Sequence, residues 1–183
     1  DAEADARTAL SALRRWLRRD EGNVTMDFVI CLPVILMILL ASFEAGLATI
    51  RKVWLERALD LTVRELRVGA LGSNPGHDLV RERLCSQIFV MPDCLTDLRL
   101  EMNVIDRTTW AGLDPAPTCV DRTTEIQPYL DFVQGGSNEL GAMRACAVFN
   151  PTFPTTPLGL QLRLDASGGY QLAAMTVFVN EPR

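Results

Sequence analysis

Hydrophobic residues are most concentrated in one run near the start of the chain, from Phe28 to Phe43, which contains no charged residue. The wider apolar segment extends from Val24 to Ile50, and its only charged residues are Asp27 and Glu44. A helix needs about 20 mostly apolar residues, each rising about 1.5 Å, to cross a bilayer. The segment is longer and more uniformly apolar than a buried core helix. We therefore expect it to span a membrane, with a bend at Pro33.

After residue 50 the pattern changes from a continuous apolar run to the spacing of an amphipathic helix. We expect one helix to continue from about Val24 to Val68, with an apolar stripe on one side and a solvated, charged face on another. The stripe consists of Leu55, Leu59, Val63, Leu66 and Ala70, and the charged face of Arg57, Asp60, Arg64 and Arg67. Turn-forming residues between Gly69 and Gly76 predict the end of this helix.

The rest of the chain, residues 71–183, is long enough for one small domain. Helical spacing and strand-like alternation predict a helix at Asp78–Val90, strands at Leu98–Val104 and Met143–Phe149, and a hairpin with arms Leu158–Leu164 and Tyr170–Val179. We expect the last of these strands to be well buried. Because the helices precede the strands, the pattern favours an α+β domain with an antiparallel sheet.

Basic residues on both sides of the apolar segment indicate its orientation. Four arginines precede it in the stretch Arg14–Arg19, so the positive-inside rule places the N-terminus in the cytoplasm. Arg51, Lys52 and Arg57 follow the segment and reduce this contrast. We expect three regions, namely a cytoplasmic basic leader (1–22), a transmembrane and stalk helix (23–70) and a domain on the far side of the membrane (71–183).

The cysteines support an oxidising compartment for that domain. Cys85, Cys94, Cys119 and Cys146 all follow the apolar segment, and an even number is suited to two disulfides. Of the three possible pairings we prefer Cys85–Cys94 with Cys119–Cys146, because each joins near neighbours in sequence. A zinc site is disfavoured, because no pair has Cys-x-x-Cys spacing and the chain has a single histidine. Cys31, within the apolar segment, is expected to be a small packing residue.

The apolar segment does not fit an ordinary secretory signal. It is longer than the 7–15 residues of a signal core, and no small-x-small cleavage site follows it. The leader is therefore removed ahead of the helix or is retained.

The residues Gly22-Asn-Val-Thr-Met-Asp27-Phe28 resemble the prepilin peptidase site of type IV pilins, where a glycine precedes the cut and an acid lies five positions on. An aromatic directly after the acid is similar to the Tad (Flp) pilus branch. With Pro33 and Phe43-Glu44-Ala45-Gly46-Leu47, this stretch resembles the TadE/TadG-like pilus assembly family over about residues 20–60. Asp27 stands where that family usually has glutamate.

The resemblance implies a processing site at Gly22, Asn23, Asp27 and Phe28, with cleavage after Gly22. The new amino group of Asn23 would then pair with Asp27 of a neighbouring subunit, which offsets the cost of two charges in lipid. From the residues alone, Asp27 is a carboxylate that interacts favourably with the helix dipole. Glu44 lies about 25 Å farther along the helix, near the opposite membrane face, where we expect a charge without a special role.

Enzymatic chemistry finds little support in the sequence. His77 is the only histidine and follows Pro75-Gly76, so we expect it to be solvated in a loop. No Gly-x-Ser-x-Gly or glycine-rich phosphate-binding motif is present, and Gly135-Gly136 and Gly168-Gly169 are interpreted as turns. The net charge of −5, with clustered basic residues only in the leader, argues against nucleic-acid binding.

We therefore expect a non-catalytic minor pilin or pseudopilin-like component of a Tad (Flp) type pilus, with no cofactor. The resemblance implies other Tad/Flp pilins, pilus assembly proteins and the prepilin peptidase as partners, and a single-pass location in the bacterial inner membrane with residues 71–183 in the periplasm. One alternative is an uncleaved signal-anchored periplasmic binding or sensor domain. Another is a membrane-tethered enzyme with an unrecognised site. A mature N-terminus at Asn23 would distinguish the pilin-like protein from the anchored one.

Overall fold

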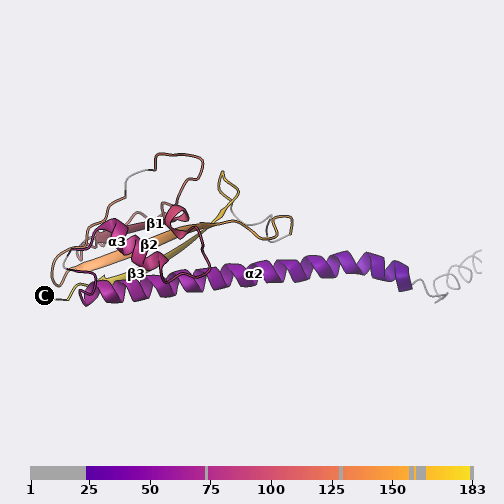
Figure 1. The fold of residues 1–183 in the computed structure, drawn as a ribbon, viewed down its shortest axis with the longest axis horizontal. Helices are drawn as coiled ribbons and strands as arrows, with labels where there is room; N and C mark the ends of the chain where they lie inside the picture. The colour runs from indigo at the N-terminus through magenta and orange to yellow at the C-terminus, as the bar shows by residue number, and fades with distance from the viewer. Residues whose placement is uncertain (1–23, 73, 128–129, 157–158, 160–163, 182–183) are drawn as a thin grey trace, which may run out of the picture. The chain divides into compact units, whose positions relative to one another are not determined.

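A computed structural model describes residues 24–72, 74–127, 130–156, 159 and 164–181. The elements are α2 (Val24–Arg67), α3 (His77–Cys85), α4 (Cys94–Asp97), β1 (Leu98–Val104), β2 (Leu140–Phe149) and β3 (Tyr170–Val179) (Figure 1). The chain divides after Leu40 into two compact units. A long helix followed by short helices and an antiparallel sheet confirms the predicted α+β class.

The long helix α2 follows the predicted continuous pattern. Asp27 lies in its first turn, where a carboxylate stabilises the positive end of the helix dipole, and Pro33 lies inside it. The helix ends at Arg67 because Gly69 adopts a positive φ of 73°, which lets the Ala70 N–H donate back to the Glu65 carbonyl at 3.0 Å. The predicted stop at Gly69 is confirmed.

The sheet is antiparallel with strand order β1-β2-β3, so β2 is the central strand. Leu98 pairs with Ala147 across β1 and β2, and Phe149 pairs with Tyr170 across β2 and β3. Almost every residue of β2 is buried, whereas β3 alternates between buried and exposed side chains. The expectation of a well-buried β3 is therefore wrong. β3 lies at an edge of the sheet, and only one of its faces packs on the core.

The ladder partner of β3 is β2. Of the predicted first hairpin arm, Leu158–Leu164, the structure describes Gly159 and Leu164, and Leu164 forms a single antiparallel bridge with Tyr170. The predicted turn before β3 is present: the Gly168 N–H donates to the Asp165 carbonyl at 3.0 Å. Gly168 has a φ of 79°, a conformation that favours glycine.

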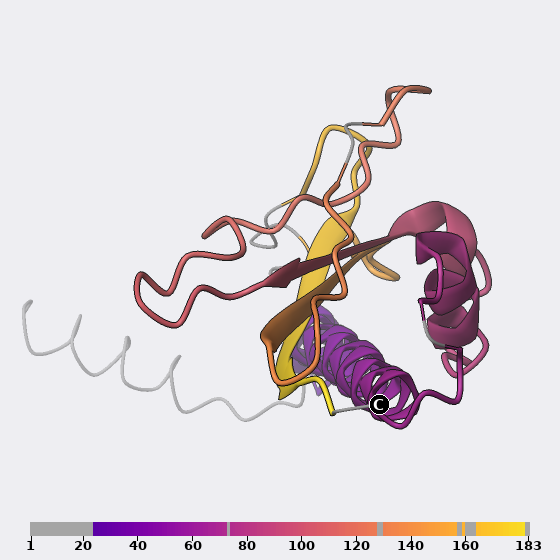
Figure 2. The ribbon, with the colours of Figure 1, turned by 90° about the vertical axis from the view of Figure 1, so that its left-hand side faces the viewer.

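The core of the second unit lies between one face of the sheet and the helices α2 and α3 (Figure 2). Four residues of the predicted α2 stripe are at most 5% exposed, namely Leu55, Leu59, Val63 and Leu66. They pack with Val80 and Leu84 of α3 and with alternate residues of the strands. The fifth predicted stripe residue, Ala70, is exposed. That prediction is wrong because the helix ends before it.

The second helix is shorter than predicted. α3 ends at Cys85 instead of Val90, because the next turn tightens: the Gln87 and Ile88 N–H groups donate to carbonyls three residues back, at 3.1 Å. The one-turn helix α4 follows, and the sequence analysis did not predict it. Ile88 is nevertheless buried, so the apolar spacing correctly identified a core residue.

The other face of the sheet is covered by the long segment between β1 and β2. Arg144 of β2 is buried, forms an ion pair with Glu101 of β1, and donates to the carbonyls of Asp114 (2.6 Å) and Ala116 (3.1 Å). One guanidinium thus supplies the hydrogen-bond donors for two carbonyls of a loop that belongs to no helix or strand. The segment returns to the sheet edge at Phe132, which forms a parallel bridge with Met102.

Candidate functional site

The apolar part of α2 before Leu40 has exposed side chains on every side. Phe28 is 60% exposed and Ile30 65%, and none of the most apolar window of the helix is buried. By length and composition this helix can cross a membrane. Exposed apolar side chains all around a helix require lipid or partner helices to cover them.

The predicted processing site is described in part. Asp27 and Phe28 are exposed in the first turns of α2, whereas Gly22 and Asn23 lie outside the described residues. Asp27 is the only charged residue between Val24 and Phe43, so no other residue of this apolar stretch can pair with its carboxylate. The role of these four residues in processing stays a prediction.

Glu44 differs sharply from its expected role as an ordinary interfacial charge. Its side chain is fully buried, at 0% exposure. The carboxylate accepts hydrogen bonds from the Thr152 N–H at 3.0 and 3.1 Å and from the Phe153 N–H at 2.9 Å. The rings of Phe43 and Phe153 meet edge to face, with centroids 6.0 Å apart. Glu44 therefore holds a loop more than a hundred residues away, and the expectation for it is wrong.

Arg51 holds the same loop two helical turns later. Its Nη1 donates to the Tyr170 hydroxyl at 2.6 Å and to the Asn150 carbonyl at 3.2 Å. The guanidinium also lies over the rings of Phe149 and Tyr170, at 5.2 and 5.9 Å from their centroids. The sequence analysis assigned Arg51 only to the charges that flank the membrane.

Together these contacts form what we call the α2 clamp, defined as Glu44 and Arg51 with the segment Phe149–Phe153 and Tyr170. The two α2 residues are seven positions apart, so they lie on one face of the helix and in line with the buried stripe from Leu55. The clamp attaches the end of β2 and the start of β3 to this helix face. The partners of Glu44 and Arg51 could not be identified from local spacing, because each contact joins residues about a hundred positions apart.

Both disulfides that the sequence analysis preferred are present. Cys85 is bonded to Cys94 and links the end of α3 to the start of α4. Cys119 is bonded to Cys146 and fixes the long covering segment to the central strand. Cys31 is exposed on α2 and forms no disulfide.

His77 is not a solvated loop residue as expected. It is the first residue of α3, its side chain is 35% exposed, and its Nε2 lies 3.2 Å from the Leu100 carbonyl oxygen. Its ring meets that of Phe132 edge to face, with centroids 5.2 Å apart. Among the described residues, no group of three or more His, Cys, Asp or Glu is placed to hold a metal ion.

Comparison with known families finds a match to the model described as TadE-like protein, over residues 22–64. This match confirms the resemblance inferred from the sequence over about residues 20–60. No curated protein and no solved structure matches the chain. The matched range contains the apolar part of α2, Asp27 and both helical residues of the clamp. Residues 22–64 are therefore similar to the TadE-like model, and the match does not extend to the sheet or to the helices after α2.

Proposed function

We propose that the chain is a non-catalytic minor pilin or pseudopilin of a Tad (Flp) type pilus assembly system, held in the bacterial inner membrane by α2. The observation that carries this proposal is the first half of α2, which exposes apolar side chains on all sides and has one carboxylate in its first turn. A membrane anchor needs the apolar surface but not the carboxylate. The TadE-like match over the same residues supports a role in pilus assembly.

In this proposal the N-terminus is cytoplasmic and the unit Ala41–Arg183 is periplasmic. The arginines of the leader support the orientation. The two disulfides support an oxidising compartment, because such bonds persist there and are rare in the cytosol.

Cleavage by a prepilin peptidase after Gly22 would leave the amino group of Asn23 as a cation at the start of α2. A neighbouring subunit that offers Asp27 would pair with it. Both charges would otherwise face lipid, where an unpaired charge is costly. Assembly with other pilins would thus be favoured by a charge pair that forms between subunits and not within one.

The test compares Asp27→Ala with Asp27→Glu, which keeps the carboxylate. Asp60→Ala is the matched control, because Asp60 is an exposed carboxylate farther along the same helix. If Asp27 acted only on the helix dipole, its loss would cost under about 1 kcal/mol and would leave assembly unchanged. We expect Asp27→Ala to be cleaved and inserted but to co-purify poorly with partner pilins, while Asp27→Glu and Asp60→Ala co-purify like the parent.

Sequencing of the mature N-terminus provides a second readout. We expect Asn23 as the first residue of the parent, and a larger, uncleaved product from Gly22→Leu. Normal-size protein from Gly22→Leu would reject the cut site. An intact leader in the parent, with equal recovery of Asp27→Ala and parent, would favour an uncleaved signal-anchored domain.

A further inference from the structure

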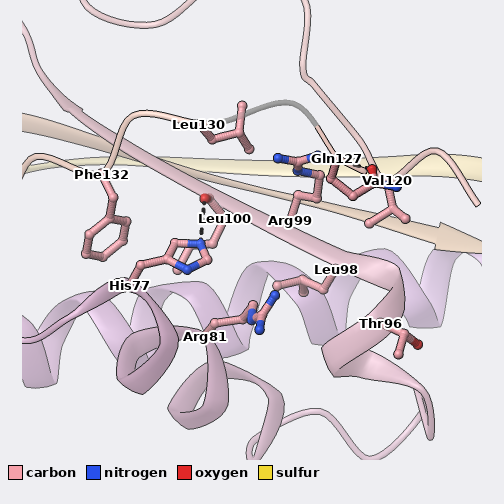
Figure 3. Close-up of a pocket in the computed structure, with 10 residues that line it drawn as sticks. All are labelled: His77, Arg81, Thr96, Leu98, Arg99, Leu100, Val120, Gln127, Leu130 and Phe132. Atoms are coloured by element: carbon pink, nitrogen blue, oxygen red, sulfur yellow. Dashed lines mark hydrogen bonds between the residues drawn. The ribbon is translucent and has the colours of Figure 1, made fainter. Parts of the chain in front are cut away.

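A cavity of about 390 Å³ opens at the edge of the sheet, between α3, β1 and the returning segment that contains Gln127 and Phe132 (Figure 3). Much of its wall is apolar, from Leu98 and Leu100 of β1 and from Leu130 and Phe132. A volume of this size is typical of small-molecule sites, in which apolar walls surround a few polar groups.

The charged side chains that line the cavity, those of Arg81 and Arg99, are both positive. Arg81 of α3, Arg99 of β1 and the only histidine of the chain, His77, line it, and no described lining residue carries a carboxylate. The chain as a whole has a net charge of −5, so three basic side chains around one apolar cavity are opposite to its overall balance. This arrangement favours an anionic ligand.

Arg81 lines the cavity, and its guanidinium has only one weak charge partner among the described residues. Its Nε is buried and has no hydrogen-bond partner among the described residues. Its charge partner is Asp78, whose carboxylate lies 3.5 Å from Nη2 and is 88% exposed, so water weakens this pair. A ligand carboxylate in the cavity would give the Arg81 guanidinium a partner that is better shielded from water than Asp78.

Arg99 is half-buried, with the carboxylate of Glu101 and the guanidinium of Arg81 both near enough to affect its charge. Its Nη1 donates to Gln127 Oε1 at 3.1 Å. Burial lowers the pKa of the Arg99 guanidinium, nearby Glu101 raises it, and the positive charge of Arg81 lowers it. A bound anion would favour the charged form of Arg99, as Glu101 does, and would offset the effect of burial.

The backbone of β1 adds a further donor. Met102 donates its N–H to Asp131 and accepts from Val133, so its polar groups point away from β2. Because this direction alternates along an antiparallel strand, the N–H and C=O of Leu100 also point outward, toward the cavity side. The Leu100 carbonyl faces His77 Nε2, and the Leu100 N–H lies on the same edge.

From this geometry we propose that the cavity binds a small organic carboxylate with an apolar body. The carboxylate lies between the guanidinium groups of Arg81 and Arg99, within reach of the Leu100 N–H. The apolar body packs against Leu98, Leu130 and Phe132. The site is separate from the apolar part of α2 and from the clamp, so it does not depend on the role proposed in pilus assembly.

The test uses the full chain in lipid nanodiscs and fluorine NMR of para-fluorobenzoate, with empty nanodiscs as background. The uncharged para-fluorobenzamide has the same apolar ring. We expect the carboxylate to bind and to be displaced by unlabelled benzoate, and the amide to bind much more weakly. Removal of one charged hydrogen-bond donor, by Arg81→Gln or Arg99→Gln, is expected to weaken binding by about tenfold.

Arg57→Gln is the matched control, because Arg57 is an exposed arginine on α2. We expect it to bind like the parent, and we expect all three variants to keep both disulfides. Equal binding of the carboxylate and the amide would overturn the proposal, as would undiminished binding by both cavity variants. Failure of the parent to bind para-fluorobenzoate at millimolar concentration would also overturn it.

Discussion

The most informative single change is Glu44→Gln, which removes one charge from the α2 clamp and keeps the size of the side chain. In the parent, the buried carboxylate accepts from two successive backbone N–H groups, those of Thr152 and Phe153. A glutamine has one acceptor oxygen and an NH₂ group in place of the other. The NH₂ group of the glutamine would therefore face a backbone N–H group, and two donors cannot form a hydrogen bond with each other.

The size of the effect follows from these two bonds. A hydrogen bond to a charged group contributes about 1.5–3 kcal/mol and a neutral one about 0.5–1.5 kcal/mol, so each bond loses about 1 kcal/mol. The loop from Asn150 to Phe153 is partly exposed, and water can recover some of this loss. We expect local opening of the loop to become easier by between about 1 and 2 kcal/mol, which corresponds to roughly 5- to 30-fold faster amide exchange.

The assay is hydrogen exchange of the Thr152 and Phe153 amides in the full chain, measured in nanodiscs. Glu56→Gln is the matched control, since it makes the same change on the same helix at a side chain that is 51% exposed. We expect exchange at both amides to accelerate in Glu44→Gln and to stay at the parent rate in Glu56→Gln. Equal rates in Glu44→Gln and the parent would refute the interpretation of Glu44 as the acceptor that holds this loop.

Two further predictions concern the stability of the second unit. Two hydrogen bonds of 2.7 Å from Arg83 lower the pKa of Glu65, against a smaller raising effect of burial, and the Arg83 charge lowers it further. The pair therefore stabilises the fold above the unfolded Glu pKa of about 4.3, and this contribution is lost as the pH falls through the folded pKa of Glu65. In a plot of melting temperature against pH, Glu65→Gln should therefore reduce the decrease seen below about pH 4.3. Removing the Cys119–Cys146 bond, by replacing both residues with serine, should cost about 3.6 kcal/mol on chain entropy and lower the melting temperature, whereas Cys31→Ser should leave it unchanged.

The elements that could be predicted from sequence are those with a strong local pattern. β1 and β3 have the predicted bounds, because their side chains alternate between the core and the other face. The long helix was predictable because one apolar run continues directly into an amphipathic stripe. The disulfide pairing was predictable because each bond joins cysteines that are near in sequence.

What could not be predicted depends on contacts between distant parts of the chain. An isolated glutamate beside an apolar segment has the same local pattern whether it is solvated or buried. The N–H groups that Glu44 binds belong to a loop that begins about a hundred residues later, and the sequence of that loop does not indicate that it binds a carboxylate. The central position of β2 was missed for a related reason: its small and apolar residues predicted a strand but not which neighbours would cover both of its faces.

The cavity beside α3 illustrates the same limit. His77 and Arg81 come from α3 and Arg99 comes from β1, so no local spacing in the sequence brings the three residues to one site. From its sequence context alone, His77 was expected to be a solvated loop residue. Its position at the first residue of α3, opposite the outward carbonyl of Leu100, gives it a defined place at the sheet edge.

The α2 clamp also determines how a load on the helix would reach the sheet. Glu44 and Arg51 are about 10 Å apart along α2, and both hold the chain just beyond β2, while Arg51 also binds the first residue of β3. Sliding the helix past the sheet by one turn would separate a buried carboxylate from its donors without supplying others, which is costly. Farther along α2, the buried side chains from Leu55 to Leu66 pack in the core and oppose the same motion. A pull on α2 would therefore act on the end of the central strand as well as on one edge strand.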